Sequence, residues 1–233
     1  KDTKKDVVEF MIKFCEEVLG KGVVVCKDVP NFIGNRIGVF DISNAVALMV
    51  QKGLTVEEVD ATIGKAVGRP GTAIFGTLDL VGLDTGYHVM KNLYAAVPDD
   101  ESRDLFQPVG FFDKMMEKKW LGNKTRQGFY KKTKDAKGKN VKMVLDYNTL
   151  EYVAPVKPKF ASVSEAKKAS DLGVDESMRV VFAGKDKAAD LIASDVLRTT
   201  LALRIVGDEF SKENLAMALF GDTATLAQTG STV

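Results

Sequence analysis

The sequence contains very few of the side chains on which metal sites and disulfide frameworks depend. Its 233 residues include one histidine, His88, and two cysteines, Cys15 and Cys26. These numbers exclude a site with several histidine ligands, a four-cysteine metal site and a disulfide framework. A Ser-His-Asp triad would have to use His88, but a lone histidine in a helical pattern is more often a surface residue. We expect Cys15 and Cys26 to be buried, reduced thiols of a cytoplasmic protein.

Long apolar runs and an excess of one charge are also missing. No run approaches the ~20 residues that cross a bilayer, and no signal peptide opens the chain, so no membrane insertion is expected. The 33 Lys and Arg residues nearly balance the 32 Asp and Glu residues, which argues against a protein that holds nucleic acid by bulk electrostatics. The length suits one large domain or two small ones. Since the first residue is Lys1 rather than methionine, we expect a processed or excised terminus.

Apolar residues recur at helical spacing through most of the chain. Thr55 and Glu58 form a predicted capping box at one helix start, and Ser162 and Glu165 form a second. Asn31 is the predicted N-cap of the long helix that follows it. Between the helices lies a short β-branched run at residues 22–26. The predicted helices cover residues 3–19, 33–52, 55–67, 73–83, 85–96, 111–120, 165–171, 176–183 and 185–206.

The pattern changes between residues 128 and 153, where apolar and polar residues alternate in strand fashion around a turn at Asn148-Thr149. Pro155 and Pro158 then bound a linker, so we place a domain boundary there, with domains at 1–150 and 151–233. The end of the chain, residues 221–233, has little periodicity and is a predicted frayed tail. The sequence therefore predicts a mainly α fold with a small β excursion near 128–153.

The usual cofactor-binding loops are absent, since no G-x-G-x-x-G, G-x-x-x-x-G-K-[ST] or G-x-S-x-G motif occurs. The first candidate for chemistry is Asn35, which falls in the first turn of the helix predicted over 33–52 and off its apolar stripe. Its carboxamide can donate a hydrogen bond to a carbonyl oxygen, assisted by the positive end of the helix dipole. A solvated asparagine is the alternative, and the spacing alone favours it.

Two further segments carry charged groups. Between residues 64 and 84, Arg69 interrupts a helix, and Asp79 and Asp84 lie five residues apart, hence on different helix faces. This spacing favours capping and turn roles over acid–base catalysis. The lysine-rich stretch 114–142 could receive an anionic ligand such as a nucleotide phosphate, although a solvated basic face is the default interpretation.

Four motifs, taken together and in order, resemble a known family. They are K-D-V-P-N-F-I-G-N-R-I (27–37), V-D-A-T-I-G-K-A-V-G-R-P (59–70), L-D-L-V-G-L-D-T (78–85) and K-K-W-L-G-N-K-T-R-Q-G-F-Y (118–130). Over about 1–132 the chain resembles the C-terminal helical domain of 3-hydroxyacyl-CoA dehydrogenases, which has a 6-phosphogluconate-dehydrogenase C-terminal-like fold. Residues 133 to about 205 look like the continuation in larger, multifunctional members, to which an enoyl-CoA hydratase domain can be fused.

The resemblance implies an NAD-dependent oxidation of L-3-hydroxyacyl-CoA to 3-oxoacyl-CoA in fatty-acid β-oxidation. It implies that NAD and the catalytic His–Glu pair belong to a preceding Rossmann domain of the full-length chain, and that the helical domain binds acyl-CoA and forms a homodimer. The Asn of the family's F-I-x-N-R motif, here Asn35, is implied to be catalytic by holding the 3-oxygen. Asn31, Arg36 and Arg69 are implied to bind substrate. P-N-F-I replaces the family's common P-G-F-I, so no acyl chain-length preference is carried over.

A second function remains open from the sequence. A non-catalytic helical module could keep the same fold only for dimerisation or CoA binding. Asn35 beside Arg36 at a helix start favours the enzyme, but no residue of this chain excludes the module.

Overall fold

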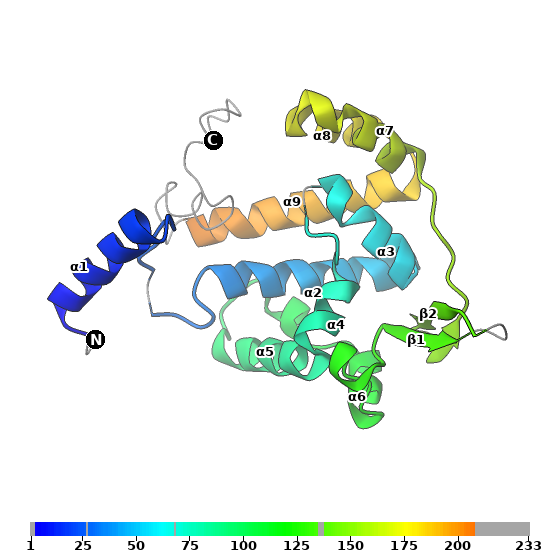
Figure 1. The fold of residues 1–233 in the computed structure, drawn as a ribbon, viewed down its shortest axis with the longest axis horizontal. Coiled ribbons are helices and arrows are strands. Elements are labelled where there is room, and N and C mark those ends of the chain that lie inside the picture. Colours follow the sequence, from blue (N-terminus) through cyan, green and yellow to red (C-terminus); the bar gives the residue numbers. More distant parts are fainter. Residues whose placement is uncertain (1–2, 27, 68, 135–137, 208–233) are drawn as a thin grey trace. The chain divides into compact units, whose positions relative to one another are not determined.

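The computed structural model describes residues 3–26, 28–67, 69–134 and 138–207, and these residues are mainly helical (Figure 1). The chain divides into two compact units, one of residues 1–37 with 202–233 and the other of residues 38–201. The predicted frayed tail, residues 221–233, lies outside the described residues. None of the described helices is both long and apolar enough to cross a membrane.

The first unit begins with an amphipathic helix that has no buried side chain. Helix α1 (Lys5–Lys13) passes directly into a π-helical turn (Phe14–Val18), which confirms the helix predicted over residues 3–19. Its apolar face is open: Phe10, which stacks on Phe14, is 63% exposed. Gly20 follows with a φ of 59°, a left-handed conformation that glycine adopts without strain and that ends the helix.

The β-branched run at residues 22–26 forms no strand among the described residues. A strand needs a neighbouring strand with which it exchanges backbone hydrogen bonds. A run of β-branched residues favours the extended conformation but does not provide that neighbour. Cys15 and Cys26 are free and only half-buried, so the expectation of buried thiols is met in part.

The turn before the long helix corrects the predicted N-cap. Asn31 and Phe32 have φ values of 67° and 52°, and the Phe32 N–H donates to the Val29 carbonyl at 3.1 Å. Helix α2 (Gly34–Lys52) starts only after this left-handed turn. Asn31 therefore lies too early in the chain to cap it, because the turn delays the first helical residue.

The second unit buries most of its large apolar side chains between its helices, and a smaller cluster of Ala166, Val181 and Ile192 joins its last three helices. Helix α2 continues into this unit and is followed by α3 (Val56–Thr62), α4 (Phe75–Val81), α5 (Leu83–Ala96) and α6 (Gly110–Glu117). Short 3₁₀ turns at Lys65–Val67, Arg103–Phe106 and Asn123–Thr125 connect them. The large side chains that are fully buried here include Leu48, Met49, Phe75, Phe106, Phe112, Met115 and Phe129.

Local signals set two of the helix boundaries as the sequence predicted. The Thr55 hydroxyl accepts the Glu58 N–H at 3.2 Å, and the Glu58 carboxylate accepts the Thr55 N–H at 2.9 Å, so the first capping box is confirmed. Gly82, with a φ of 103°, separates α4 from α5 near the break between the helices predicted over 73–83 and 85–96.

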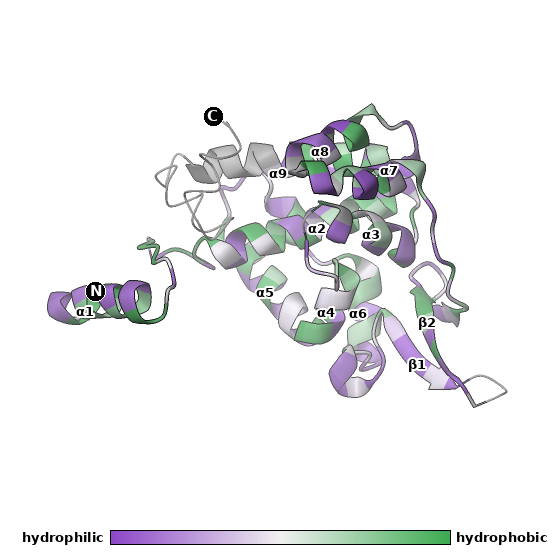
Figure 2. Ribbon diagram, turned by 45° about the horizontal axis from the view of Figure 1, so that its top comes forward, coloured by the Kyte–Doolittle hydropathy of each residue, from purple (hydrophilic) through white to green (hydrophobic). Residues whose placement is uncertain are grey.

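A three-stranded antiparallel sheet forms where strand alternation was predicted. Its order is β1 (Tyr130–Lys134), β2 (Asn140–Asp146) and β3 (Glu151–Val153), with Tyr130 opposite Val144 and Lys132 opposite Lys142. Strand β2 is largely hydrophobic and β1 largely hydrophilic (Figure 2). The sheet buries Val144 and Leu145 of β2 and leaves Lys132 and Lys134 of β1 at the surface.

The remaining helices are α7 (Ala161–Ala169), α8 (Val174–Ala183) and α9 (Lys187–Gly207), close to the predicted ranges. The second predicted capping box is wrong, because Ser162 lies inside α7. Its N–H and hydroxyl both donate to Asp186, at 2.9 and 2.6 Å, and Asp186 also accepts the Ala189 N–H at the start of α9. The predicted domain boundary near residue 150 falls within the second unit and stays a prediction.

Candidate functional site

Three of the residues implied to form the active site lie in the first unit, around the start of α2. Asn35 is exposed in the first helical turn, and Arg36 beside it is half-buried. The Asn31 carboxamide nitrogen is buried and makes no hydrogen bond with the described residues. Their roles toward a substrate stay predictions.

The fourth implied residue, Arg69, lies in the second unit and joins two helices. Its guanidinium forms an ion pair with Asp41 on α2 and another, at 3.1 Å, with Asp195 on α9. The Asn44 side chain also donates to Asp195, at 2.8 Å. Burial, together with the negative charge of Asp41, raises the pKa of Asp195 to about 6. A substrate-binding role for Arg69 stays a prediction, and any ligand there competes with these two carboxylates.

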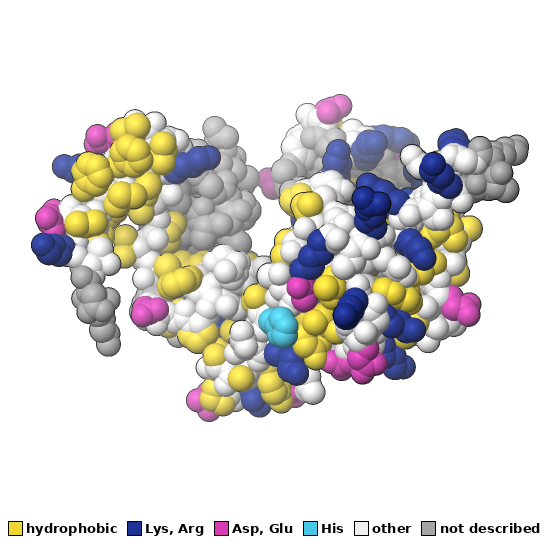
Figure 3. Space-filling view, turned by 60° about the horizontal axis from the view of Figure 1, so that its bottom comes forward, with side chains coloured by type: hydrophobic (Ala, Val, Ile, Leu, Met, Phe, Trp, Pro, Cys, Tyr) yellow, Lys and Arg dark blue, Asp and Glu magenta, His cyan; other side chains and the backbone are white. Residues whose placement is uncertain are grey.

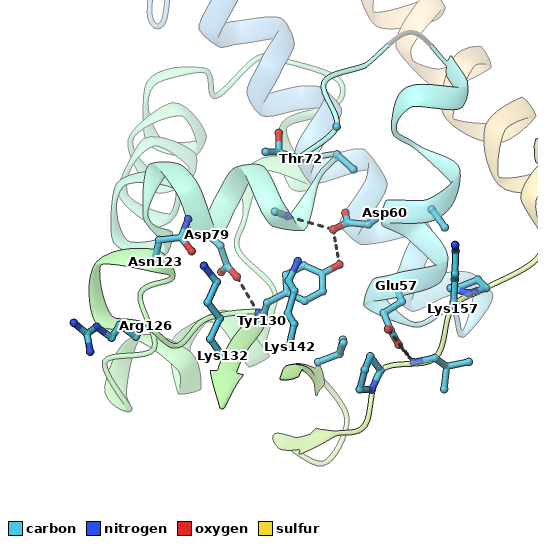
Figure 4. Close-up of a pocket in the computed structure, with 18 residues that line it drawn as sticks. Glu57, Asp60, Thr72, Asp79, Asn123, Arg126, Tyr130, Lys132, Lys142 and Lys157 are labelled. Carbon is cyan, nitrogen blue, oxygen red and sulfur yellow. Dashed lines mark hydrogen bonds between the residues drawn. The ribbon is translucent and has the colours of Figure 1, made fainter. Parts of the chain in front are cut away.

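A pocket of about 1210 Å³ lies in the second unit, between α3, the start of α4, the sheet and the segment that follows β3 (Figure 4). Two carboxylates, Asp60 and Asp79, and the phenol of Tyr130 line its inner side. Four cationic side chains line it as well: Arg126, Lys132, Lys142 and Lys157. His88, the single histidine, is exposed on the surface and does not line this pocket (Figure 3).

Asp60 holds the start of α4. Its carboxylate accepts the backbone N–H groups of Ile74, Phe75 and Gly76 at 3.0, 2.8 and 3.2 Å, which satisfies amide donors at the helix start. The Tyr130 hydroxyl donates to the same carboxylate at 2.6 Å. Burial raises the pKa of Asp60 despite these four hydrogen bonds. The acid is therefore fully engaged in holding the fold.

Asp79 holds the start of the sheet in the same way. Its carboxylate accepts the backbone N–H groups of Phe129 and Tyr130, each at 2.9 Å, and burial raises its pKa to about 6. Gly128 is required beside it, since a Cβ there would lie 2.0 Å from the Asp79 Oδ1. Asp84 instead points outward and pairs with Lys124. The two acids lie on two helices, Asp79 on α4 and Asp84 on α5, because α4 ends at Gly82 between them; the prediction from their spacing along one helix therefore does not apply.

The cations of the pocket form no close ion pair in the part of the chain that the structure describes, although the charge of Lys142 works to lower the pKa of Glu57 and of Asp79. The Lys142 ammonium lies 3.4 Å from the centre of the Tyr130 ring. Arg126, Lys132 and Lys142 come from the lysine-rich stretch that the sequence marked for an anionic ligand. Within the same described ranges, no group of three His, Cys, Asp or Glu side chains could hold a metal ion.

Comparison with known proteins assigns this helical region. The family model described as "3-hydroxyacyl-CoA dehydrogenase, C-terminal domain" matches residues 32–132, which include α2 to α6 and the start of β1. Residues 32–132 belong to this C-terminal domain family. The mainly helical fold with a small sheet agrees with that assignment.

Two relatives match a longer stretch of the chain than the family model does. A "Probable 3-hydroxyacyl-CoA dehydrogenase" of Bacillus subtilis (strain 168) is 42% identical over 201 residues, which is 86% of this chain and 24% of that protein. A "Putative fatty acid oxidation complex trifunctional enzyme" of Rickettsia prowazekii (strain Madrid E) is 33% identical over 165 residues, 70% of this chain and 23% of that protein. The chain thus spans about a quarter of the length of these two relatives.

A solved structure shares the fold of this dehydrogenase domain. The 3-hydroxybutyryl-CoA dehydrogenase from Escherichia coli K12 aligns with a TM-score of 0.53 and 20% identity, over 98% of this chain and 59% of that chain. At that identity the likeness concerns the fold alone.

The sequence did not indicate that Asp60 and Asp79 bind backbone N–H groups at the starts of α4 and β1. Asp60 and Tyr130 belong to the motifs at 59–70 and 118–130, and the sequence predicted no role of its own for either residue. Their contact joins positions 70 residues apart, and the Asp79 contact to Phe129 joins positions 50 residues apart. One sequence signal was available, the tripeptide Gly128-Phe129-Tyr130. Buried backbone N–H groups need an acceptor, and a carboxylate from elsewhere in the chain is one that could bind those of Phe129 and Tyr130.

Proposed function

We propose that the full-length protein is an NAD-dependent 3-hydroxyacyl-CoA dehydrogenase of fatty-acid β-oxidation, which oxidises L-3-hydroxyacyl-CoA to 3-oxoacyl-CoA. This chain supplies the part that binds substrate and forms a homodimer, in the cytoplasm. The match of residues 32–132 to the family's C-terminal domain carries this proposal. The names of the Bacillus and Rickettsia relatives support the reaction and the pathway.

The residues of this chain do not fit a dinucleotide site. Its described strands are all antiparallel, and the sequence lacks the G-x-G-x-x-G loop that receives a pyrophosphate at a helix start. NAD is therefore assigned to a Rossmann domain outside this chain, together with the acid–base pair. What this chain contributes is contact with the acyl-CoA.

Asn35 is the residue of this chain that we assign to catalysis. Its carboxamide is exposed at the first turn of α2, where the helix dipole adds positive potential, so its NH₂ group can donate to the substrate's 3-oxygen. A donor that stabilises developing negative charge on an oxygen typically contributes ~10²–10³ in rate. Asn31, Arg36 and Arg69 are assigned to substrate binding.

The alternative is a non-catalytic helical module for dimerisation or CoA binding. The open apolar face of α1, on which Phe10 and Met11 are 63% and 46% exposed, favours an interface role for this unit. An interface is also compatible with the enzyme, so only activity separates the two functions.

The test is Asn35→Ala in the full-length protein, with reduction of acetoacetyl-CoA by NADH as the assay. We expect kcat to fall by ~10²-fold or more while the melting temperature stays close to that of the wild type. Asn92→Ala, an exposed asparagine on α5, is the matched control and should keep full activity. Unchanged turnover in Asn35→Ala would remove Asn35 from the site. A wild-type protein without acetoacetyl-CoA reduction would favour the non-catalytic module.

A further inference from the structure

None of the residues assigned above to catalysis or substrate binding lines the basic pocket of the second unit. Two of its cations face each other directly, because Lys132 on β1 is the cross-strand partner of Lys142 on β2. Directly opposed side chains of an antiparallel pair have Cβ atoms about 5 Å apart, and like charges at that spacing destabilise a sheet. Both side chains extend along the same side of the sheet, toward Asp79 and Tyr130 (Figure 4).

The acids of the pocket do not neutralise this pair by ion pairing. Asp60 accepts three backbone amides and a phenol, and Asp79 accepts two backbone amides. Glu57, on the far wall, accepts the Val156 N–H at 3.0 and 3.1 Å. The hydrogen bonds of these carboxylates come from neutral donors, while the charge of Lys142 acts on Glu57 and Asp79 and works to lower the pKa of each against the effect of burial. Neither ammonium group forms a close ion pair among the described residues, so both keep N–H donors for a ligand.

The pocket is too large for a lone inorganic anion. Its volume of about 1210 Å³ exceeds the roughly 300–1,000 Å³ that sites for drug-sized molecules occupy. Opposite the lysines, the segment after β3 forms an apolar wall, in which Val156 is 68% exposed between Pro155 and Pro158. Lys157 on this segment adds a third cation at the pocket. The pocket thus has an apolar wall at Pro155, Val156 and Pro158 and a pair of cations at Lys132 and Lys142. This combination suits a ligand that carries both an apolar ring and phosphate groups.

We propose that this pocket binds a nucleotide through its phosphate groups, which lie between the ammonium groups of Lys132 and Lys142. Lys157 contacts a further phosphate oxygen, and the base rests on the wall of residues 155–158. Ammonium–phosphate hydrogen bonds are strong because both partners are charged, and the bound anion relieves the repulsion between the opposed lysines. The ligand is either a free nucleotide or the nucleotide end of a coenzyme A, and where it is coenzyme A the inference rests on the proposed function.

The test is calorimetric titration of the 233-residue chain with adenosine 3′,5′-bisphosphate, pyrophosphate and coenzyme A. We expect saturable binding of adenosine 3′,5′-bisphosphate, weaker binding of pyrophosphate, and a loss of affinity at high salt. Coenzyme A that binds as tightly as the bisphosphate identifies the coenzyme as the source. Weaker binding of coenzyme A identifies a free nucleotide. Pyrophosphate that binds as tightly as the bisphosphate would overturn the assignment to a nucleotide.

Matched variants locate the site. Lys132→Met should weaken binding of the bisphosphate by roughly tenfold or more, and Lys142→Met by a similar factor. Lys131→Met removes the same charge from the neighbouring position of β1, where the side chain lies over the Tyr152 ring, and should leave the affinity unchanged. Because the opposed lysines repel, Lys132→Met should also raise the melting temperature while it weakens binding. Equal losses in Lys131→Met and Lys132→Met, or no saturable binding to the wild type, would refute the site.

Discussion

Asp79 makes the stability of the second unit depend on pH in a direction opposite to that of an ordinary surface carboxylate. It is only 3% exposed, and burial raises its pKa from 3.8 to about 6. The folded state therefore binds the proton more tightly than the unfolded state does. Stability from this group is complete below pH 3.8 and is lost as the pH rises through about 6.

The magnitude follows from the two pKa values. The gap between 3.8 and about 6 corresponds to about 3 kcal/mol, since each tenfold change in proton affinity is worth ~1.4 kcal/mol. Asp79→Asn keeps the shape and one acceptor oxygen but cannot titrate. We therefore expect the wild type to lose about 2.5 kcal/mol more stability than Asp79→Asn between about pH 4 and pH 7, since the unfolded carboxyl is already partly ionised at pH 4.

Urea unfolding across this range measures the difference. The single tryptophan, Trp120, lies 5.3 Å from the Tyr152 ring at the edge of the sheet, so its fluorescence reports on the region that Asp79 holds. Asp99→Asn, an exposed acid in the turn after α5, is the control and should follow the wild type. Parallel stability curves for the wild type and Asp79→Asn would refute the argument that burial controls this carboxyl.

Two other substitutions test the contacts that hold the second unit together. Gly128→Ala places a Cβ 2.0 Å from the Asp79 Oδ1, so we expect a loss of about 3 kcal/mol or more in the same unfolding assay, and a loss below ~1 kcal/mol would contradict the packing. Arg69→Met removes the cation that pairs with Asp41 and Asp195, and should lower the free energy of unfolding by about 3 kcal/mol. Lys52→Met breaks the exposed pair with Asp190 and should lower it by less than ~1 kcal/mol. Equal losses in Arg69→Met and Lys52→Met would show that the Arg69 pairs add no more than an exposed bridge.

Helices with strong local signals were predictable from the sequence. The periodicity of α2, the capping box at Thr55 and the glycine hinge at Gly82 all act over a few residues, so the sequence contains their full cause. The box at Ser162 looked the same but failed, because Asp186, 24 residues later, binds both its N–H and its hydroxyl. Local rules hold where no distant group competes.

The candidate site was predictable only in its charge. The lysine-rich stretch pointed to an anionic ligand, but spacing along the chain could not show that Lys132 and Lys142 oppose each other. That follows from the register of β1 on β2, which depends on which face of β2 carries its apolar positions. The roles of Asp60 and Asp79 likewise depend on amides that lie far along the chain, so neither residue could be assigned from its neighbours.

The contacts of Asp60 and Asp79 also bear on how far the second unit can be shortened without loss of its fold. A fragment that ends at residue 132, where the family match ends, retains Asp60 and Asp79 and the amides they bind. It loses β2 and β3, which leaves the ladder edge of β1 unpaired and uncovers Phe129 beneath the sheet. The shortest stable fragment of the second unit therefore extends beyond Val153, so the folding unit is longer than the stretch by which the family is recognised.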